Sequence, residues 1–219
     1  TADSFNVVVT VYAPVTGGSI QKDSIVCNVA DTIVKLTNDT AGNGGYGGTY
    51  SWEKSTDNGT TWTLIPNSNG VDYTPSYHDN LGTVLYRRMY SANCDKEPSN
   101  TVSVTYYGNI LAGDVICTNG CDTNYCSGSN ISVTLRTSGI TIQSNAPYSI
   151  QWQQSTDNGA TWTNISGATS ATYTYINSNF TSPIQFRYTI TVTGCAAVPS
   201  NSVHSIGVWA LPVVSIAEV

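Results

Sequence analysis

Short stretches of alternating apolar and polar residues run along the whole chain, separated by turns rich in Gly and Asn. Because successive side chains of a β-strand point to opposite faces of a sheet, this alternation predicts half-buried strands. In the first half of the chain the predicted strands cover residues 32–36, 50–55, 61–65, 72–75, 84–90 and 101–106. In the second half they cover residues 131–135, 150–155, 161–165, 171–175, 184–192 and 202–208.

The two series of strands belong to an internal repeat. YSWEKSTDNGTTWTLI, which begins at Tyr50, aligns with IQWQQSTDNGATWTNI, which begins at Ile150. Six or seven short strands in about one hundred residues are typical of an immunoglobulin-like β-sandwich. The sequence therefore predicts an all-β chain of two tandem immunoglobulin-like domains arranged end to end, residues 13–108 and 109–208, and no long helix.

One tryptophan in each copy is predicted to lie in the core. Trp52 and Trp152 alternate with polar neighbours on the third predicted strand, so their side chains point to one face of the sheet. We expect each to form the centre of its own domain.

The two ends of the chain resemble the junction between the copies. The segment 6–20 is similar to 101–116, and the tail from residue 202 is similar to both. Residues 1–12 then have the character of a last strand or linker, and residues 209–219 that of a linker or the start of a further unit. We expect a piece of a longer array. The alternative is that residues 1–12 form a spare strand that completes a sheet in a neighbouring copy.

Composition narrows the classes of partner and compartment. Only 10% of the 219 residues are charged, against about 25% in ordinary soluble domains, and the net charge is −6. The sequence has no basic stripe that would bind nucleic acid, and it has no apolar run of the roughly 20 residues that a membrane helix needs. We therefore expect neither nucleic-acid binding nor membrane insertion. Six cysteines beside two histidines favour disulfides over a metal or redox site, which indicates an extracellular, secreted location.

The residues resemble a known family, the immunoglobulin-like tandem repeats of large Bacteroidetes cell-surface adhesins of the gliding-motility type. Those repeats share a Cys before a V-x-L strand, a Y-x-W strand, an STDNG-T-W hairpin, a Y-R-Y-type strand and a Cys in the last turn. Here the matching residues of the first copy are Cys27, Val34, Leu36, Trp52, Ser55 to Trp62, Tyr86, Arg87, Arg88 and Cys94. Those of the second are Cys126, Trp152, Ser155 to Trp162, Phe186, Arg187, Tyr188 and Cys195. The resemblance implies cell adhesion at a cell surface or in a filament.

Aligning the copies equates Cys27 with Cys126 and Cys94 with Cys195, which predicts one disulfide in each copy. Cys117 and Cys121, present only in the second copy, are expected to form a local bridge, although four cysteines allow three connectivities. One difficulty stands against the pairing within each copy. The second and sixth strands of an immunoglobulin sandwich run in the same direction, which places the two cysteines at opposite ends.

The repeated hairpin matches S-x-D-x-G-x-T-W, the Asp-box of sialidases and other propellers. Asn-Gly supplies the two positive φ angles of a tight turn, and the Asp carboxylate accepts N–H groups within it, so the role predicted is structural. Two copies one hundred residues apart do not fit propeller blades of about 40–50 residues. The hairpin residues are Ser55, Asp57, Asn58, Gly59 and Trp62, with Ser155, Asp157, Asn158, Gly159 and Trp162.

Other chemistry has weak sequence support. Gly42, Gly44 and Gly47 match G-x-G-x-x-G, but a strand rather than a helix follows, so a loop is expected. No cofactor is expected, except that junction carboxylates leave Ca²⁺ as an alternative. These carboxylates belong to Asp95, Glu97, Asp114 and Asp122.

The sequence predicts no enzyme. His78 and His204 are single and unmatched between the copies, and Asp57 with Asp157 is the only acid repeated in the matched core. Short matches to bacterial O-glycosylation motifs make Ser24, Thr32 and Thr40 candidate glycosylation sites.

The expected function is that of a secreted structural or adhesive module, with disulfide-stabilised tandem spacers. The expected partners are neighbouring repeats or other copies of the chain. Fourteen tyrosines keep a carbohydrate-binding module with surface glycans as an alternative, and strand donation from residues 1–12 within a filament as another.

Overall fold

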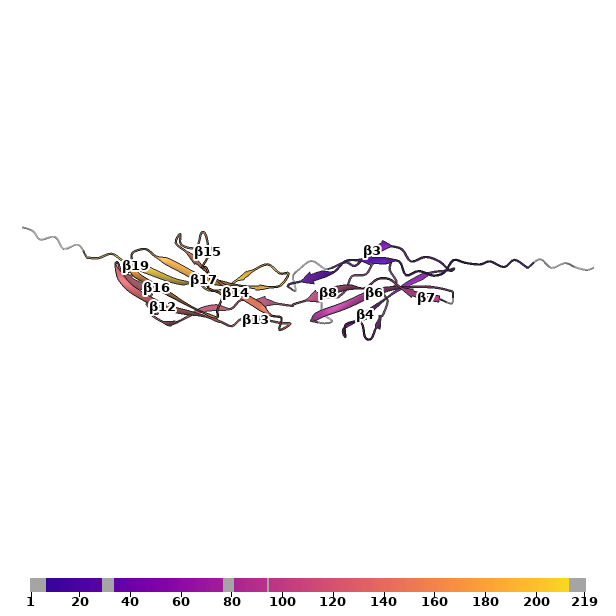
Figure 1. The fold of residues 1–219 in the computed structure, drawn as a ribbon, viewed down its shortest axis with the longest axis horizontal. Coiled ribbons are helices and arrows are strands. Elements are labelled where there is room, and N and C mark those ends of the chain that lie inside the picture. The colour runs from indigo at the N-terminus through magenta and orange to yellow at the C-terminus, as the bar shows by residue number, and fades with distance from the viewer. Residues whose placement is uncertain (1–6, 29–33, 77–80, 94, 213–219) are drawn as a thin grey trace, which may run out of the picture. The chain divides into compact units, whose positions relative to one another are not determined.

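The computed structural model describes residues 7–28, 34–76, 81–93 and 95–212. These residues contain strands and turns and no helix, and so offer no helix of membrane-spanning length and hydropathy. The chain divides into two compact units, residues 1–106 and 107–219 (Figure 1). Both units are immunoglobulin-like β-sandwiches, as the repeat predicts.

The second domain shows the sandwich most completely. One sheet has the order β10-β12-β16, and the other has the order β11-β19-β17-β14-β15 with β18 paired to β17. The early chain divides between the sheets, because β10 pairs with β12 whereas β11 runs parallel to the last strand β19. The strands are β9 Ile110–Leu111, β10 Asp114–Asn119, β11 Asn124–Cys126, β12 Ser129–Ser138, β13 Thr141–Ile142, β14 Tyr148–Ser155, β15 Thr163–Asn164, β16 Thr172–Phe180, β17 Ile184–Val192, β18 Val198–Pro199 and β19 His204–Trp209.

The first domain repeats this plan with a shorter first sheet. β1 pairs only with β3, and the second sheet has the order β2-β8-β6-β4-β5 with β7 paired to β6. Here too the early strand β2 lies parallel to the last strand β8. The strands are β1 Ser19–Gln21, β2 Ser24–Val26, β3 Thr37–Thr40, β4 Thr49–Ser55, β5 Thr63–Ile65, β6 Gly82–Ala92, β7 Asp95–Pro98 and β8 Val102–Tyr106.

Each domain encloses its own core around the predicted tryptophan. Trp52 and Trp152 are both 0% exposed. Each indole N–H donates to a backbone carbonyl eighteen residues on, Trp52 to Gly70 at 2.9 Å and Trp152 to Ser170 at 3.0 Å. The alternation in β4 and β14 therefore correctly predicts which face is buried.

The strand predicted over residues 72–75 is wrong. It is reduced to one bridge, in which Leu36 and Tyr73 exchange backbone hydrogen bonds of 2.8 and 3.0 Å. In the second domain the matching pair of Leu135 and Tyr173 is followed by the pair of Val133 and Tyr175. The residue of the first domain that matches Tyr175 is Pro75, which has no N–H to donate, so the ladder stops there.

The strand predicted over residues 32–36 also differs. β3 begins at Thr37, and residues 29–33 lie outside the described ranges. In the second domain β16 extends from Thr172 to Phe180, well beyond the predicted end at residue 175.

The expected pairing of Cys126 with Cys195 is wrong. Cys126 is free and exposed, whereas Cys195 is disulfide-bonded. Cys126 lies opposite Trp209, beside the start of β17, and Cys195 follows the end of that strand. Nine residues at about 3.3 Å each separate the two ends, far beyond the Cα spacing of about 4–7 Å that a disulfide allows.

The other cysteines are placed as follows. Cys117 and Cys121 form the expected local disulfide, with Cα atoms 5.5 Å apart. Cys27 is disulfide-bonded. The bond expected between Cys27 and Cys94 involves a residue outside the described ranges.

Candidate functional sites: the twin hairpins and the surface beside them

The two Asp-box hairpins have nearly the same geometry. In the first, the Ser55 hydroxyl donates to Asp57 Oδ1 at 2.7 Å and accepts the N–H of Gly59 at 2.8 Å, while the N–H of Thr61 donates to Asp57 Oδ1 at 2.9 Å. The second hairpin has the same three bonds, at 2.7, 2.8 and 2.9 Å, among the matching residues. The repeat therefore preserves a local network of hydrogen bonds as well as a sequence.

Asn-Gly provides the backbone conformation that the network requires. The φ angles are 57° and 86° at Asn58 and Gly59, and 58° and 85° at Asn158 and Gly159. Two consecutive positive φ angles are the signature of the tight turn predicted from the Asn-Gly pair.

The two Asp carboxylates are fixed in their ionised form. Donation from the Thr61 hydroxyl, then from the Thr61 N–H and the Ser55 hydroxyl, lowers the pKa of Asp57 to about 2. The matching donors from Thr161 and Ser155 lower the pKa of Asp157 to about 2. A carboxylate that is ionised and saturated with donors closes a turn and is poorly suited to act as a general acid near neutral pH.

This pKa shift predicts an acid-dependent stability. The native pKa of Asp157 lies below the unfolded value of 3.8, so the stabilisation is complete above about pH 4 and is lost as pH falls through about 2. We expect Asp157→Asn to lower the thermal midpoint of the second domain at pH 6 and to leave it nearly unchanged at pH 2. Thermal unfolding between pH 2 and 6 measures this. An equal loss at both pH values would show that ionisation does not stabilise the turn.

A stacked arginine fastens each hairpin to its sheet. The guanidinium of Arg87 lies 4.1 Å from the ring centre of Trp62, and that of Arg187 lies 4.3 Å from the ring centre of Trp162. Such cation–π contacts contribute about 0.5–2 kcal/mol each. The Trp side chains thus pack on strands β6 and β17.

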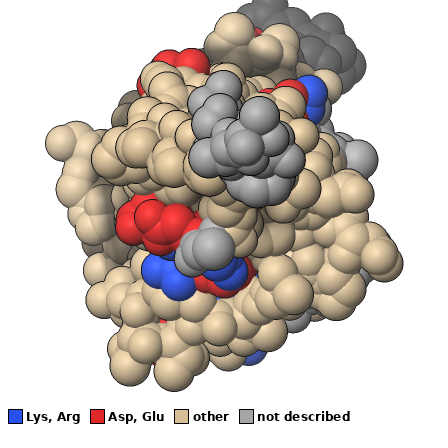
Figure 2. All heavy atoms as spheres, turned by 90° about the vertical axis from the view of Figure 1, so that its right-hand side faces the viewer, with Lys and Arg blue, Asp and Glu red and all other residues tan. Residues whose placement is uncertain are grey.

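The far side of each arginine contacts the neighbouring strand. Arg87 pairs with Glu53 at 2.7 Å, and Lys96 reaches the other oxygen of Glu53 at 3.0 Å. In the second domain Arg187 Nε–H instead donates a hydrogen bond to Gln153 Oε1 at 2.8 Å. Figure 2 shows that charged side chains are few on the face it displays, and that positively and negatively charged side chains lie close together there.

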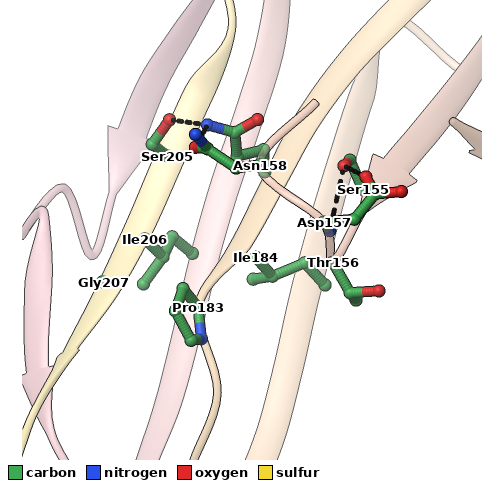
Figure 3. Close-up of a pocket in the computed structure, with 10 residues that line it drawn as sticks. Ser155, Thr156, Asp157, Asn158, Pro183, Ile184, Ser205, Ile206 and Gly207 are labelled. Atoms are coloured by element: carbon green, nitrogen blue, oxygen red, sulfur yellow. Dashed lines mark hydrogen bonds between the residues drawn. The ribbon is translucent and has the colours of Figure 1, made fainter. Parts of the chain in front are cut away.

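A shallow depression of about 460 Å³ lies beside the second hairpin (Figure 3). Pro183, Ile184 and Ile206 provide apolar surface. On its polar side the Gln185 amide donates to Asn158 Oδ1 at 3.1 Å and to the Ser205 hydroxyl at 3.0 Å. The polar side chains that line the depression are hydrogen-bonded to one another, and the Asp157 carboxylate is occupied within the turn. The depression therefore offers no free acid or base, and its hydrogen bonds stabilise the hairpin.

The first domain lacks the polar bridge of this depression. The residue opposite Ser103 in its sheet is Leu85, whereas the residue opposite Ser205 is Gln185. The glutamine bridge is therefore specific to the second copy.

The candidate calcium ligands do not form a cluster. Asp95 and Glu97 lie on the exposed strand β7, Asp114 begins β10, and Asp122 lies in the irregular segment between β10 and β11. Within the described ranges no group of three or more His, Cys, Asp or Glu side chains is close enough to hold a metal ion.

His204 lies in a strand and the glycine motif in a loop. His204 lies on β19 and burial lowers its pKa, while His78 lies outside the described ranges. The G-x-G-x-x-G run forms a loop before β4, with positive φ at Gly44, Gly45 and Gly47.

Of the candidate glycosylation sites, Ser24 lies in β2 and the exposed Thr40 ends β3. Thr32 lies outside the described ranges.

The sequence did not indicate a buried arginine, yet Arg88 is 0% exposed. Its guanidinium donates to Asn38 Oδ1 at 2.6 Å and to the carbonyls of Val71, Thr40 and Gly17 at 2.9, 2.9 and 3.3 Å. It also lies 4.7 Å from the ring centre of Tyr50. Arg88 thereby fastens the segment that leads into β1, together with β3, to the second sheet.

Tyr188 occupies the matching position in the second domain. Trp152 lies opposite Tyr188 just as Trp52 lies opposite Arg88. The Tyr188 hydroxyl donates to the carbonyls of Ala112 and Asp114, so it holds the segment that leads into β10 in the same way. In the sequence, the only signal for this shared role was that the aligned runs 86–88 and 186–188 differ at their last position, Arg88 against Tyr188.

Comparison with known proteins gives a family and similar folds. A family model described as a domain of unknown function, DUF8696, matches residues 16–108 and again residues 115–208. A crystal structure of a titin fragment is 15% identical with a TM-score of 0.44, covering 89% of this chain and 61% of that one. The FN1-FN3 domains of chicken CNTN1 are 10% identical with a TM-score of 0.36, covering 88% of this chain and 67% of that one. No curated protein matches the sequence.

Proposed function

Since this chain belongs to the DUF8696 family and carries two copies of its domain, we propose that it is an extracellular structural module that bears tension within a cell-surface adhesin or filament. The resemblance to Bacteroidetes adhesin repeats supports this proposal. Its mechanism is mechanical, with the two sandwiches acting as spacers.

The parallel pairing of early and last strands is the observation that carries the proposal. β2 pairs with β8 through residues 24–26 and 104–106, and β11 pairs with β19 through residues 124–126 and 207–209. In a parallel pair, tension applied at the start of one strand and the end of the other slides the strands along each other. All the hydrogen bonds of the ladder then resist together.

Side chains strengthen this junction in the first domain. The Asp23 carboxylate accepts the N–H of Ser103 at 2.6 Å and its hydroxyl at 2.8 Å, which lowers the pKa of Asp23. The Asn100 amide accepts from the N–H of Ile20 at 2.7 Å and donates to its carbonyl at 3.0 Å. Early and late segments are therefore joined beyond the backbone ladder.

In the second domain, backbone bonds extend the ladder at both ends. Gly207 donates to Thr123 at 2.7 Å and Ser127 donates to Trp209 at 2.9 Å. Both domains thus reinforce the same junction by different means.

An extracellular location is supported by the disulfide of Cys117 and Cys121 and by the disulfide-bonded Cys27 and Cys195. Disulfides persist mainly in oxidising compartments, and immunoglobulin-like sandwiches are common there.

Single-molecule pulling of the reduced chain tests the proposal. We expect two unfolding steps of nearly equal length. Each matched segment extends to about 33 nm at about 3.6 Å per residue, and the length released is this value less the end-to-end distance of the folded domain. Ile25→Pro places a proline in β2, and we expect it to lower the unfolding force of one step only. Leu64→Ala, on the exposed strand β5 outside the ladder, is the control. Equal forces for Ile25→Pro and the unmodified chain would contradict the tension-bearing role.

One observation favours a second candidate, carbohydrate binding. Tyr12 and Tyr46 are 47% and 67% exposed, and their ring centres lie 5.8 Å apart. Exposed aromatic rings can stack on sugars. A glycan array probed with the chain and with Tyr46→Ala tests this candidate, and the absence of hits that depend on Tyr46 would exclude this pair as a sugar site.

A further inference from the structure

We propose that residues 7–12 of one copy of the chain add as a strand to the free edge of β16 in a second copy. Copies of the chain would then associate with one another, which the tension-bearing role does not require. It rests on two unpaired strand features of this chain, one an apolar segment and the other a sheet edge.

The donor segment is apolar, extended and without a sheet partner among the described residues. Val7, Val8, Val9 and Val11 are 78–88% exposed. The segment VVVTVY has no charge and no proline, and valine, threonine and tyrosine favour strands. Its sequence resembles that of β8, which is fully paired inside the first domain.

The donor is held at its base and leads away from the linker between the domains. Gly45 donates to the Ala13 carbonyl at 3.0 Å, and Thr16 exchanges backbone hydrogen bonds with Asn43. A side chain at Gly45 would touch Ala92, which ends β6, whereas the first domain's exit at Tyr106 lies opposite Gly82, which begins β6. About 33 Å of strand separates these ends, which favours an acceptor in another molecule.

Among the residues that the structure describes, no strand pairs with the outer edge of β16. Thr137 donates to the Ala171 carbonyl, and the register continues through the pairs of Leu135 with Tyr173 and Val133 with Tyr175. Because bonded and unbonded pairs alternate in an antiparallel ladder, the N–H and C=O groups of the residues between them point away from β12. These residues are Thr172, Thr174 and Ile176.

The edge also lacks the usual protection against strand addition. β16 is nine residues long and contains no charge and no proline, and Ile176 on its outer face is 74% exposed. Natural edge strands are normally short or carry charges or proline. The first domain has such a guard in Pro75, so the acceptor is expected only in the second domain.

The two features match in chemistry and length. Six extended residues cover the three outward-facing residues of β16, and the alternation of the donor gives an apolar row of Val7, Val9 and Val11. Backbone hydrogen bonds would supply the affinity, and this row would cover the open side of the sandwich next to Tyr173 and Tyr175.

The experiment is sedimentation velocity on the full chain between roughly 1 and 300 µM, with Val9→Pro for the donor and Ile176→Lys for the acceptor. We expect association of the unmodified chain, and at least tenfold weaker association for each variant. Leu64→Lys alters an apolar residue that is 57% exposed on another edge strand, β5, and this variant is expected to associate normally. Val9→Pro lies outside the folded core, so loss of folding cannot explain its effect.

Hydrogen exchange identifies the interface directly. In the associated form we expect slower exchange at the amides of Thr172, Thr174 and Ile176, and a synthetic peptide of residues 6–13 should dissociate the assembly. A chain that stays monomeric at 300 µM would overturn the proposal, as would association that survives either variant. Protection of β16 in a monomer, independent of concentration, would show pairing within one chain and also overturn it. Pulling of single molecules does not depend on association, so the two proposals fail separately.

Discussion

Replacing Trp152 by alanine is expected to unfold the second domain and leave the first intact. Trp152 is fully buried, lies 5.3 and 5.8 Å from the ring centres of Tyr188 and Tyr173, and donates to the Ser170 carbonyl. Truncating such a side chain costs about 3–5 kcal/mol, a large part of the roughly 5–15 kcal/mol that stabilises a small domain. Calorimetry should show one transition shifted or lost.

The matched variant is Trp52→Ala, which should affect only the other transition. The cores are separate, because the residues clustered around Trp52 all belong to the first domain. Trp209→Ala, at a 60% exposed position, is the control and should change neither transition by more than about 0.5 kcal/mol. If Trp52→Ala and Trp152→Ala each shifted both transitions equally, the domains would not fold independently.

Arg88→Ala is expected to be the second most damaging change. It removes the guanidinium donor from four oxygen acceptors of the first domain, those of Asn38, Val71, Thr40 and Gly17, of which only the contact with Gly17 is fully buried. A buried unsatisfied acceptor costs about 1–3 kcal/mol and a part-buried one less, so we expect a loss of at least about 2 kcal/mol. Urea unfolding of the first domain measures it.

Arg88→Tyr separates this fastening role from a general effect of burial. At the matching position of the second domain, the Tyr188 hydroxyl donates to the carbonyl of Ala112, in the segment before β10. We therefore expect a tyrosine at position 88 to reach the Gly17 carbonyl, in the corresponding segment before β1. We expect Arg88→Tyr to be more stable than Arg88→Ala by at least about 1 kcal/mol. Arg136→Ala, at an exposed position of β12, is the control. Equal stability of the two variants at position 88 would contradict the fastening role.

The hairpins and cores were predictable because their determinants are local. Asn-Gly sets the φ angles of the turn, and Ser55 and Asp57 complete the network within residues 55–61. The alternation around Trp52 likewise depends only on the period of a strand. Such features follow from sequence patterns without knowledge of the rest of the fold.

The cysteine pairing and the first sheet were not predictable in the same way. Alignment equates Cys126 and Cys195 with Cys27 and Cys94, and the immunoglobulin strand order already argued that the two cysteines of a copy lie at opposite ends. The pairing of β11 with β19 decides between these signals, because it places Cys126 and Cys195 a strand length apart. The edge of β16 is similar, because its outward groups depend on the register with β12. Distances across a sheet are set by register, which a pattern along the chain does not contain.

The sequence by itself determined two copies of one all-β domain, each with a buried tryptophan and a tight Asn-Gly hairpin, since repetition, alternation and turn chemistry are encoded residue by residue. The tertiary structure alone decided that Arg88 and Tyr188 fasten the segments leading into β1 and β10 from within. It alone also decided that β16 has an outer edge with no partner among the described residues, where Pro75 ends the counterpart of this strand. These features depend on which backbone groups lie opposite each other once the sheets have formed. That arrangement is a property of the packed domain.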